Sequence, residues 1–234
     1  MIWRCSLSSN VWESLIKIQT LLEKQFQKTG IETREDHMDK FNRDGWVNKT
    51  WSSNLYRRAH IEVVDAREQK GLWMMHCCAF PHLHNNAPIF GIDVIAGKRK
   101  ITGFFHDYSP TTETNHPMIN AFNSMVSDYN WKKERTLPDW AKAIFTDSMV
   151  AAGNVSEEIE LNALIELSST SIDLYLQTVG LYHNNTSESE AIAAQNRYAH
   201  FQKQNPHTTR TMKALGFDES DVDFFVQKCL FPEI

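Results

Sequence analysis

Two predicted strands each carry one ionisable residue in the middle of an apolar run. His76 lies in the stretch WMMHCCAF, and Asp93 lies in PIFGIDVIAG. A carboxylate buried without compensation costs several kcal/mol, or it takes up a proton and stays neutral. A histidine and an acid in such surroundings acquire shifted pKa values that suit proton transfer at neutral pH. The two residues therefore indicate a site for proton-transfer chemistry.

The short turns between the strands predict how these residues line up. In an antiparallel hairpin, the residue numbers of facing partners have a constant sum. The polar turn before Pro88 pairs His76 with Asp93, and a turn near residues 67–70 pairs His60 with His76 to within one residue. We therefore expect His60, His76 and Asp93 to form a row across three neighbouring strands, with their side chains on one face.

Glu62 points to the same face as His60, because strand side chains alternate with a period of two. Two carboxylates and two histidines on one apolar face could transfer protons. The same face could instead bind a transition metal, with His82 and His84 as further ligands. These two histidines lie in a polar turn, about 15 Å or more from mid-strand at about 3.3 Å per residue. Proton transfer is therefore favoured, and no bound metal is expected.

Two other chemistries are disfavoured. A nucleophilic cysteine at Cys77 or Cys78 has only His76 nearby to lower its pKa, and adjacent strand residues point to opposite faces. The stretch GKRK at residues 97–100 is typical of a hairpin turn rather than of a glycine-rich phosphate loop. No nucleotide or flavin site is expected.

The strands that position these residues follow one another between residues 46 and 110. The five predicted strands are WVNKTWSS, YRRAHIEVVDA, GLWMMHCCAFP, PIFGIDVIAG and KITGFFHDYSP. Their short polar connections predict an antiparallel meander. In residues 72–80 and 88–97 both alternating sets of side chains are mostly apolar, so both faces of the sheet should be covered. His76 and Asp93 should then lie away from bulk water.

Helices are predicted on both sides of the strand block. They cover residues 11–29, 117–131, 139–144, 157–181 after a cap at Ser156, a segment begun by a capping box of Ser187 and Glu190, and 207–229, with a further strand possible in 143–153. This order predicts an α/β fold, a three-layer α/β/α sandwich with a central antiparallel sheet. No repeat or linker divides the chain, so one domain over residues 1–234 is expected.

The composition is that of a globular protein, with 41% hydrophobic and 23% charged residues among 234. No run of about 18 apolar residues predicts a membrane helix. The first residues lack the pattern of a secretion signal, and the four cysteines include no C-x-x-C pair. These features predict a protein of the reducing cytoplasm without a membrane partner. A monomer is expected.

The formal net charge of −5 disfavours nucleic acid as a partner. The basic residues nevertheless gather in local clusters: Arg57–Arg58, residues 98–100, and Lys132–Lys133 with Arg135. Such clusters are either ordinary solvated surface or a docking face for an acidic protein.

Four motifs carry a resemblance to a known family. RRAHIEVV, HCCAFP, PIFGIDVIAG and HDYSP, in this order and spacing, resemble the ferredoxin-dependent bilin reductases. The similarity continues through RTLPDWAKAIFTD and QKQNPHTTRTMKALGF, so it covers about residues 46 to 230. It implies the same sandwich fold, with an open-chain tetrapyrrole held between the sheet and the later helices.

The resemblance implies an enzyme that reduces biliverdin IXα to a phycobilin, phycocyanobilin or phycoerythrobilin. Electrons come one at a time from reduced 2Fe–2S ferredoxin, the partner protein, and no cofactor is bound. A conjugated bilin can itself hold the unpaired electron as a radical, so the protein must supply positioned protons and a dry pocket. A bilin carrier that uses the same pocket without chemistry is the alternative from another class.

The family's catalytic residues match three residues of the predicted row. Asp93 matches the central proton-donating aspartate, His76 its partner histidine, and Glu62 the glutamate associated with vinyl-group reduction. A carrier would not need this complete set, which favours the enzyme.

The family's substrate-binding residues match four further positions. His60 matches a second pocket histidine, and Arg135 a residue at a propionate. Asn205 matches a position near the substrate where relatives that make phycoerythrobilin carry an aspartate, which favours phycocyanobilin. His207 stands where the family's pattern has a lysine, so this propionate contact departs from the family.

Overall fold

The computed structural model describes residues 8–112, 115–182 and 187–234. Its centre is a seven-stranded antiparallel sheet in which each strand lies beside its neighbours in the sequence. The strands are β1 (Ile31–Thr33), β2 (Trp46–Ser52), β3 (Tyr56–Ala66), β4 (Leu72–Pro81), β5 (Ile89–Gly97), β6 (Lys100–Ser109) and β7 (Val150–Ala152). The predicted meander is confirmed, and β3 has the predicted bounds. The edge strand β1 was not predicted.

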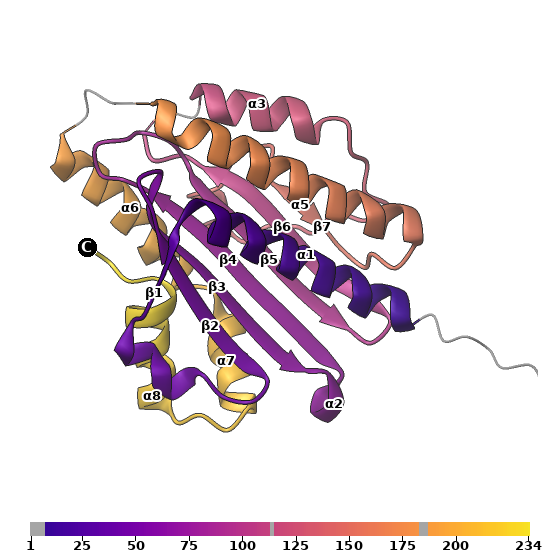
Figure 1. Ribbon diagram of the computed structural model, residues 1–234. Coiled ribbons are helices and arrows are strands. Elements are labelled where there is room, and N and C mark those ends of the chain that lie inside the picture. The colour runs from indigo at the N-terminus through magenta and orange to yellow at the C-terminus, as the bar shows by residue number, and fades with distance from the viewer. Residues whose placement is uncertain (1–7, 113–114, 183–186) are drawn as a thin grey trace, which may run out of the picture.

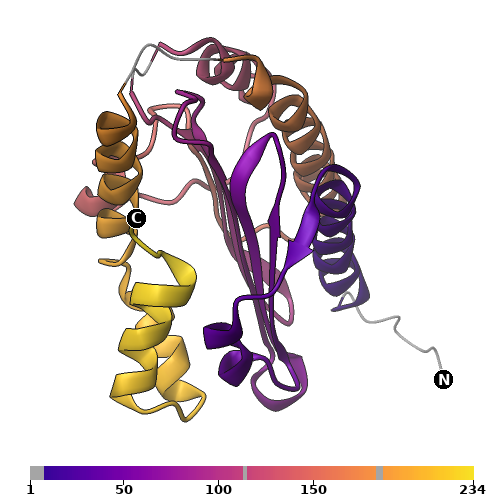
Figure 2. The same cartoon turned by 60° about the vertical axis from the view of Figure 1, so that its left-hand side comes forward.

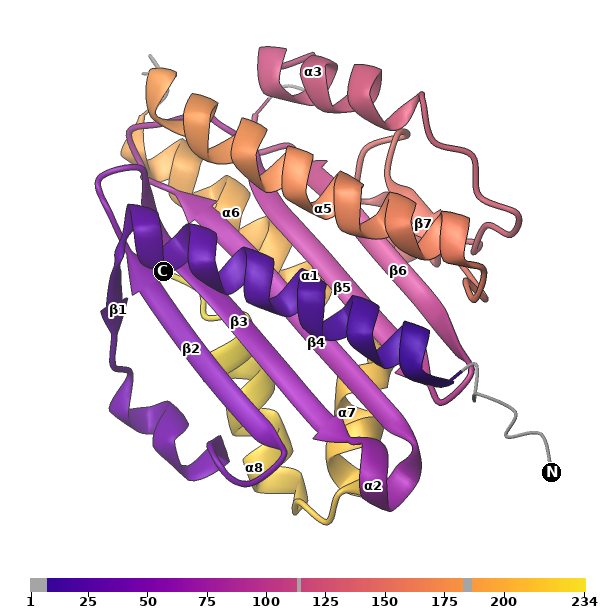
Figure 3. The same ribbon diagram turned by 45° about the vertical axis from the view of Figure 1, so that its right-hand side comes forward.

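Two helical layers enclose the sheet (Figures 1 and 2). The first contains α1 (Ser8–Thr29), α3 (Pro117–Val126) and α5 (Glu158–Thr178), and α1 and α5 lie side by side across the sheet (Figure 3). The second contains α6 (Glu188–Gln202), α7 (Pro206–Ala214) and α8 (Glu219–Phe224). The short elements are α2 (Arg67–Lys70), α4 (Asp139–Lys142), the 3-10 helices η1 (Asp36–Phe41) and η2 (Val179–Leu181), and the π-helix η3 (Phe225–Leu230). The three-layer sandwich is confirmed.

Each face of the sheet carries its own apolar core. Phe90, Ile92 and Val94 of β5 pack toward α1 and α5, in a cluster that includes Trp51 and Leu164. The opposite face belongs to a second cluster around α6, α7 and η3, which includes Phe41, Trp46, Phe80, Ile89, Tyr198 and Phe225. A fully buried side chain of this kind contributes roughly 1.5–3 kcal/mol. The alternation that predicted two covered faces is thus confirmed. None of the helices in the described ranges is long and apolar enough to cross a membrane.

The N-cap of helix α5 lies one residue later than predicted. Its N-cap is Glu157, whose side chain makes no capping hydrogen bond, so the prediction of Ser156 as the cap is wrong. The physical reason lies just upstream: Val155 exchanges two backbone hydrogen bonds with Ile101, which keep the chain extended up to that point.

The helix predicted over residues 207–229 is divided into three. Gly216, with φ of 90°, ends α7 in the left-handed region that favours glycine. The Asp218 side chain then accepts a hydrogen bond from the Asp221 backbone N–H and starts α8, which continues as the π-helix η3. This bend returns Phe231 to the sheet. At the start of α6 the predicted capping box is present.

Candidate active site

Glu62, His76 and Asp93 form a row across β3, β4 and β5. His76 lies directly opposite Asp93, as the turn predicted, and Glu62 lies directly opposite His76 on its other side. The prediction that His60 faces His76 is wrong, because His60 pairs with Cys78. The one-turn helix α2 and Gly71 in the left-handed conformation close this hairpin, which shifts the register by two residues. A shift of two leaves His60 on the same face.

His76 and Asp93 form a hydrogen-bonded ion pair. The His76 Nδ1 lies 2.6 Å from an Asp93 carboxylate oxygen. Burial lowers the pKa of His76, but the charges and hydrogen bonds of Asp93 and Cys78 together raise it by more, so that it lies well above its ordinary value. The imidazolium therefore donates this hydrogen bond at neutral pH. The side chains are 8% and 32% exposed, so Asp93 is less buried than the sequence predicted because it faces a cavity.

Glu62 is an acid with a strongly shifted pKa. Its side chain is buried among β2, β3 and β4. Burial raises the pKa of Glu62 to about 7, while His76 and Trp46 lower it and Asp93 raises it. A carboxyl with this pKa holds a proton in a large share of molecules at neutral pH and can release it, which suits a general acid.

His60 lies beside the row but does not line the cavity. It is fully buried, and its Nε2 lies 3.1 Å from the Asn48 carboxamide oxygen. Burial, followed by the charges of Arg58 and His76, lowers the pKa of His60 well below its ordinary value. The structure thus places a neutral His60 behind His76, at 6.2 Å between ring centroids, rather than on the cavity wall.

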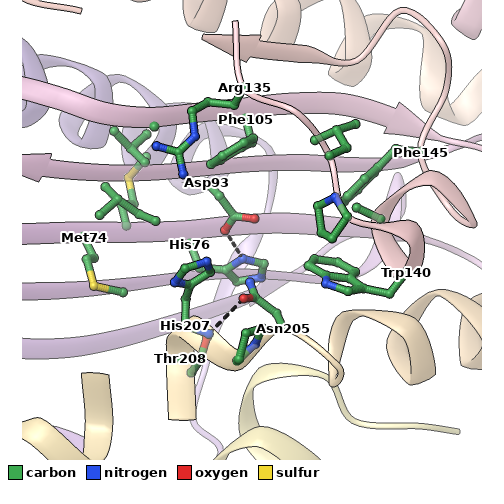
Figure 4. Close-up of a pocket in the computed structure, with 18 of the residues that line it drawn as sticks. Met74, His76, Asp93, Phe105, Arg135, Trp140, Phe145, Asn205, His207 and Thr208 are labelled. Carbon is green, nitrogen blue, oxygen red and sulfur yellow. Dashed lines mark hydrogen bonds and ion pairs between the residues drawn. The ribbon is translucent and has the colours of Figure 1, made fainter. Parts of the chain in front are cut away.

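The row opens into a cavity of about 250 Å³ between the sheet and the second helical layer. Residues 135–149, which we call the strap, form one wall, and the start of α7 and the end of η3 form others (Figure 4). Its lining is mainly apolar and includes Met74, Phe105, Leu137, Trp140, Phe145, Met149, Leu230 and Phe231. The motifs contain only three of these side chains, Leu137, Trp140 and Phe145. None of the eight was singled out, because an apolar residue of a cavity wall looks like any core residue in the sequence.

The strap is fastened to the sheet near both of its ends. The Arg135 backbone N–H donates to Ala151 of β7 at 2.7 Å. Near the other end, the Thr146 hydroxyl and backbone N–H donate to the buried Asp107 carboxylate at 2.5 and 3.1 Å. Asp107 of the HDYSP motif is therefore an anchor for the aromatic wall of the cavity.

Two basic residues, Arg135 and His207, line the cavity on the side away from Trp140 and Phe145, with Phe105 beside Arg135 (Figure 4). The Arg135 guanidinium donates to the Thr102 carbonyl at 3.2 Å and passes over Gly153, where a Cβ would lie 2.8 Å from its side chain. His207 lies at the start of α7, and partial burial and the charges of Arg210 and Arg135 lower its pKa. These groups could hold a carboxylate.

Asn205 also lines the cavity, where it caps α7. Its side-chain oxygen accepts a hydrogen bond from the His207 backbone N–H at 3.0 Å. Six of the seven residues predicted for the site therefore line one cavity, and His60 lies just behind it.

The residues considered for other chemistries lie elsewhere. His82 and His84 stack on each other, and the His82 Nε2 bonds to the Ser53 carbonyl, away from the cavity wall. No three histidine, cysteine or acidic side chains among the described residues lie together as a metal site. Cys77 faces the other core, and burial raises its pKa well above the ordinary value, which keeps it a thiol.

The basic cluster Arg57–Arg58 does not form a solvated surface. Arg58 is buried, where it pairs with Glu35 at 2.8 Å and donates to the Cys229 carbonyl at 2.8 Å. Arg57 bonds to Gln195 at 2.7 Å. This pair of arginines ties the second helical layer to β3 and is unavailable as a docking face.

Comparison with known proteins gives consistent matches over most of the chain. A family model described as ferredoxin-dependent bilin reductase matches residues 9–232. Phycocyanobilin:ferredoxin oxidoreductase from Prochlorococcus marinus (strain MIT 9515) is 28% identical over 194 residues, which are 79% of this chain and 76% of that protein. The protein of the same name from Gloeobacter violaceus is 25% identical over 189 residues, 79% of this chain and 73% of that protein.

Two solved structures are similar as well. A structure of PcyX aligns with a TM-score of 0.72 and 33% identity, over 94% of this chain and 99% of that chain. Phytochromobilin synthase from tomato, solved in complex with biliverdin, has a TM-score of 0.71 at 14% identity, over 91% of this chain and 82% of that chain. The latter similarity concerns the fold.

Proposed function

The chain belongs to the ferredoxin-dependent bilin reductase family, and we propose that it reduces biliverdin IXα to a phycobilin through bilin radicals. The observation that carries this proposal is the row of Glu62, His76 and Asp93 on the wall of an apolar cavity. Each electron that ferredoxin delivers increases the basicity of the bilin, and a proton must follow it. A dry pocket with groups that hold protons near neutral pH meets this need.

The three groups of the row have different parts in this proposal. Asp93 is the residue of the pair that is more open to the cavity, and it relays to the bilin a proton that it takes from the His76 imidazolium. His76, held as an imidazolium by Asp93, resupplies that proton. Glu62 holds a proton of its own and delivers it during vinyl-group reduction.

The product we favour is phycocyanobilin. Asn205 lines the cavity as a neutral side chain that cannot donate a proton from a carboxyl group. The relatives named phycocyanobilin:ferredoxin oxidoreductase are 25% and 28% identical to this chain. Phycoerythrobilin is the alternative, in which the reduction governed by Glu62 does not take place.

One assay separates the enzyme from a bilin carrier. The protein is mixed with biliverdin, and absorbance is followed with and without a ferredoxin reducing system. Progressive spectral change only with electrons, and a phycobilin identified by chromatography, support the enzyme. A shifted spectrum that never progresses after electrons are added leaves only the carrier.

Bilin affinity should fall as the pH rises through the range in which His207 loses its proton. The pKa of the free His207 is lowered beside Arg210 and Arg135; a bound propionate would raise it, so binding takes up a proton. Binding is therefore tightest below the pKa of free His207 and weakens until the pH exceeds the pKa of the complex. We expect a change of about tenfold per unit of pKa shift, measured as Kd by absorbance titration between pH 5.5 and 8.

Two variants are matched controls for this pH dependence. His207→Gln should bind biliverdin with the weaker affinity at every pH, and His207→Lys should bind tightly throughout. Glu62 on the same cavity wall also titrates near pH 7, so the decisive comparison is with wild type. A pH dependence as large in His207→Gln as in wild type contradicts the assignment of His207 to a propionate.

Turnover should fall steeply as salt rises, because charge steers the encounter with an acidic ferredoxin and is screened over about 8 Å at physiological ionic strength. The turn of residues 98–100 and Lys133 lie at the same edge of the sheet as Arg135. The Arg135 side chain bonds to the carbonyl of Thr102, which follows that turn, and the Gly153 backbone N–H bonds to the carbonyl of Lys133. Lys132 instead pairs with Glu157. We propose this edge as the docking face.

The matched comparison is between two double charge reversals. Lys98→Glu with Lys100→Glu should lower the rate at low salt by at least about tenfold and leave the Kd for biliverdin unchanged. Lys17→Glu with Lys24→Glu, exposed on α1 across the sheet, changes the net charge equally. Equal effects of the two pairs would argue against a local docking face, and salt-independent rates would argue against steering.

A further inference from the structure

Phe231 covers the His76 ring on the side of the second helical layer. Its ring stands edge-on to the imidazole, with centroids 5.1 Å apart and planes at 76°. Phe231 is only 3% exposed and also lines the cavity. The contacts that hold the His76 ring therefore include the hydrogen bond from its Nδ1 to Asp93 and the ring of Phe231.

The segment that carries Phe231 is hydrogen-bonded to β3. Arg58 of β3 donates to the carbonyl of Cys229, two residues before Phe231, at 2.8 Å. The guanidinium cannot swing away, because it is buried and also bonded to Glu35 at 2.8 Å. Arg58 lies on the same sheet face as Glu62 and so connects the site's own strand to the residue that covers His76.

The residues after Phe231 are held by α6. Asn196 accepts from the Ile234 backbone N–H at 2.8 Å and donates to its carbonyl oxygen at 3.2 Å. Lys203 pairs with Glu233 at 2.6 Å. Phe231 is therefore fixed from both sides along the chain, as a residue must be if it holds another in place.

We propose that Phe231 is a positioning residue for proton supply, which keeps the His76 ring in its hydrogen bond with Asp93 and keeps water away from that bond. This inference rests on the proposed role of His76. An imidazole that rotates about its χ2 angle breaks the bond to Asp93, and the Phe231 ring, with its centroid 5.1 Å from that of His76, packs against the imidazole and opposes such a rotation. Proton resupply depends on that geometry, since misplacing a catalytic group by about 1 Å can cost about a hundredfold in rate.

The test compares Phe231→Leu with Phe231→Tyr in the full chain. Leucine removes the ring and tyrosine keeps it. In the ferredoxin assay we expect Phe231→Leu to lower kcat by about tenfold, with a Kd for biliverdin within about threefold of wild type. Phe231→Tyr should retain kcat. By NMR on histidine-labelled protein, the His76 Nδ1 proton should exchange with solvent at least about tenfold faster in Phe231→Leu.

Phe145→Leu is the matched control, since Phe145 belongs to the same cavity but packs against Trp140 and Tyr198. It should weaken bilin binding without accelerating exchange at His76. Unchanged exchange in Phe231→Leu, or equal acceleration in Phe145→Leu, overturns the proposal.

The wild-type protein provides a second measurement should Phe231→Leu fail to fold. A nuclear Overhauser contact between the ring protons of His76 and Phe231 must persist with biliverdin bound. Its loss overturns the proposal. The NMR measurements need no electrons, so they remain decisive even if the protein proves not to reduce biliverdin.

Discussion

Asp93→Asn should fold, bind biliverdin and stall after the first electron. Asparagine keeps the size of the side chain and can still accept from His76 Nδ1, but it cannot take up a proton from His76 and pass it on. Loss of a general acid costs about 10²–10⁴-fold, so we expect turnover to fall by that amount. A one-electron-reduced bilin radical should accumulate, which electron paramagnetic resonance detects after reduction by ferredoxin.

Asp65→Asn is the matched control for this experiment. Asp65 also lies on a strand of the sheet, is 33% exposed compared with 32% for Asp93, and pairs with Arg67 at 2.7 Å away from the cavity. It should turn over at the wild-type rate per folded molecule. His76→Gln should slow the same step less completely than Asp93→Asn, because it removes the resupply of the proton rather than its donor. A near wild-type rate in Asp93→Asn would show that this residue is structural.

Glu62→Gln should differ from Asp93→Asn in kind. We expect an early reduction to proceed near the wild-type rate while vinyl-group reduction is blocked, so that a partly reduced bilin accumulates. The physical reason is that the carboxyl of Glu62, with a pKa of about 7, holds a proton that an amide cannot release. Chromatography of the pigments at successive times measures this. Glu160→Gln, at a second buried glutamate that accepts from the Lys132 backbone N–H outside the cavity, should make the full product.

Glu62→Gln should also change how the free energy of unfolding depends on pH, and this effect can be measured without substrate. The pKa of Glu62 rises from 4.5 to about 7 on folding, so the folded state binds more protons than the unfolded state between these values. Stability of the wild type should therefore fall as pH rises through this window, by up to about 3 kcal/mol. Glu62→Gln should lack this loss. Thermal unfolding between pH 4.5 and 8 measures it, and parallel curves for both proteins would contradict a buried, protonated Glu62.

Local sequence was enough to predict much of the sheet and the pairing of His76 with Asp93 in the row. A strand alternates with a period of two, and a tight turn closes after a fixed number of residues. The apolar runs on both sides of His76 and Asp93 therefore predicted both their pairing and the cover on each face, and the structure confirms both. The resemblance, rather than the pattern, led to Arg135, Asn205 and His207, which lie far from the row in the sequence.

The rest was decided by tertiary structure, because it depends on contacts between distant segments. The β3–β4 register depends on how α2 and Gly71 close the hairpin, and it placed Glu62 rather than His60 opposite His76. In the sequence Arg58 looks like a surface charge, but in the structure η3 packs over it. Local sequence carries no sign of these contacts, since burial and charge at a residue depend on what the rest of the chain brings beside it. For the same reason, local sequence could predict that acids and bases share one face but not their protonation states. Those are set by the pairing of His76 with Asp93 and by the burial of Glu62.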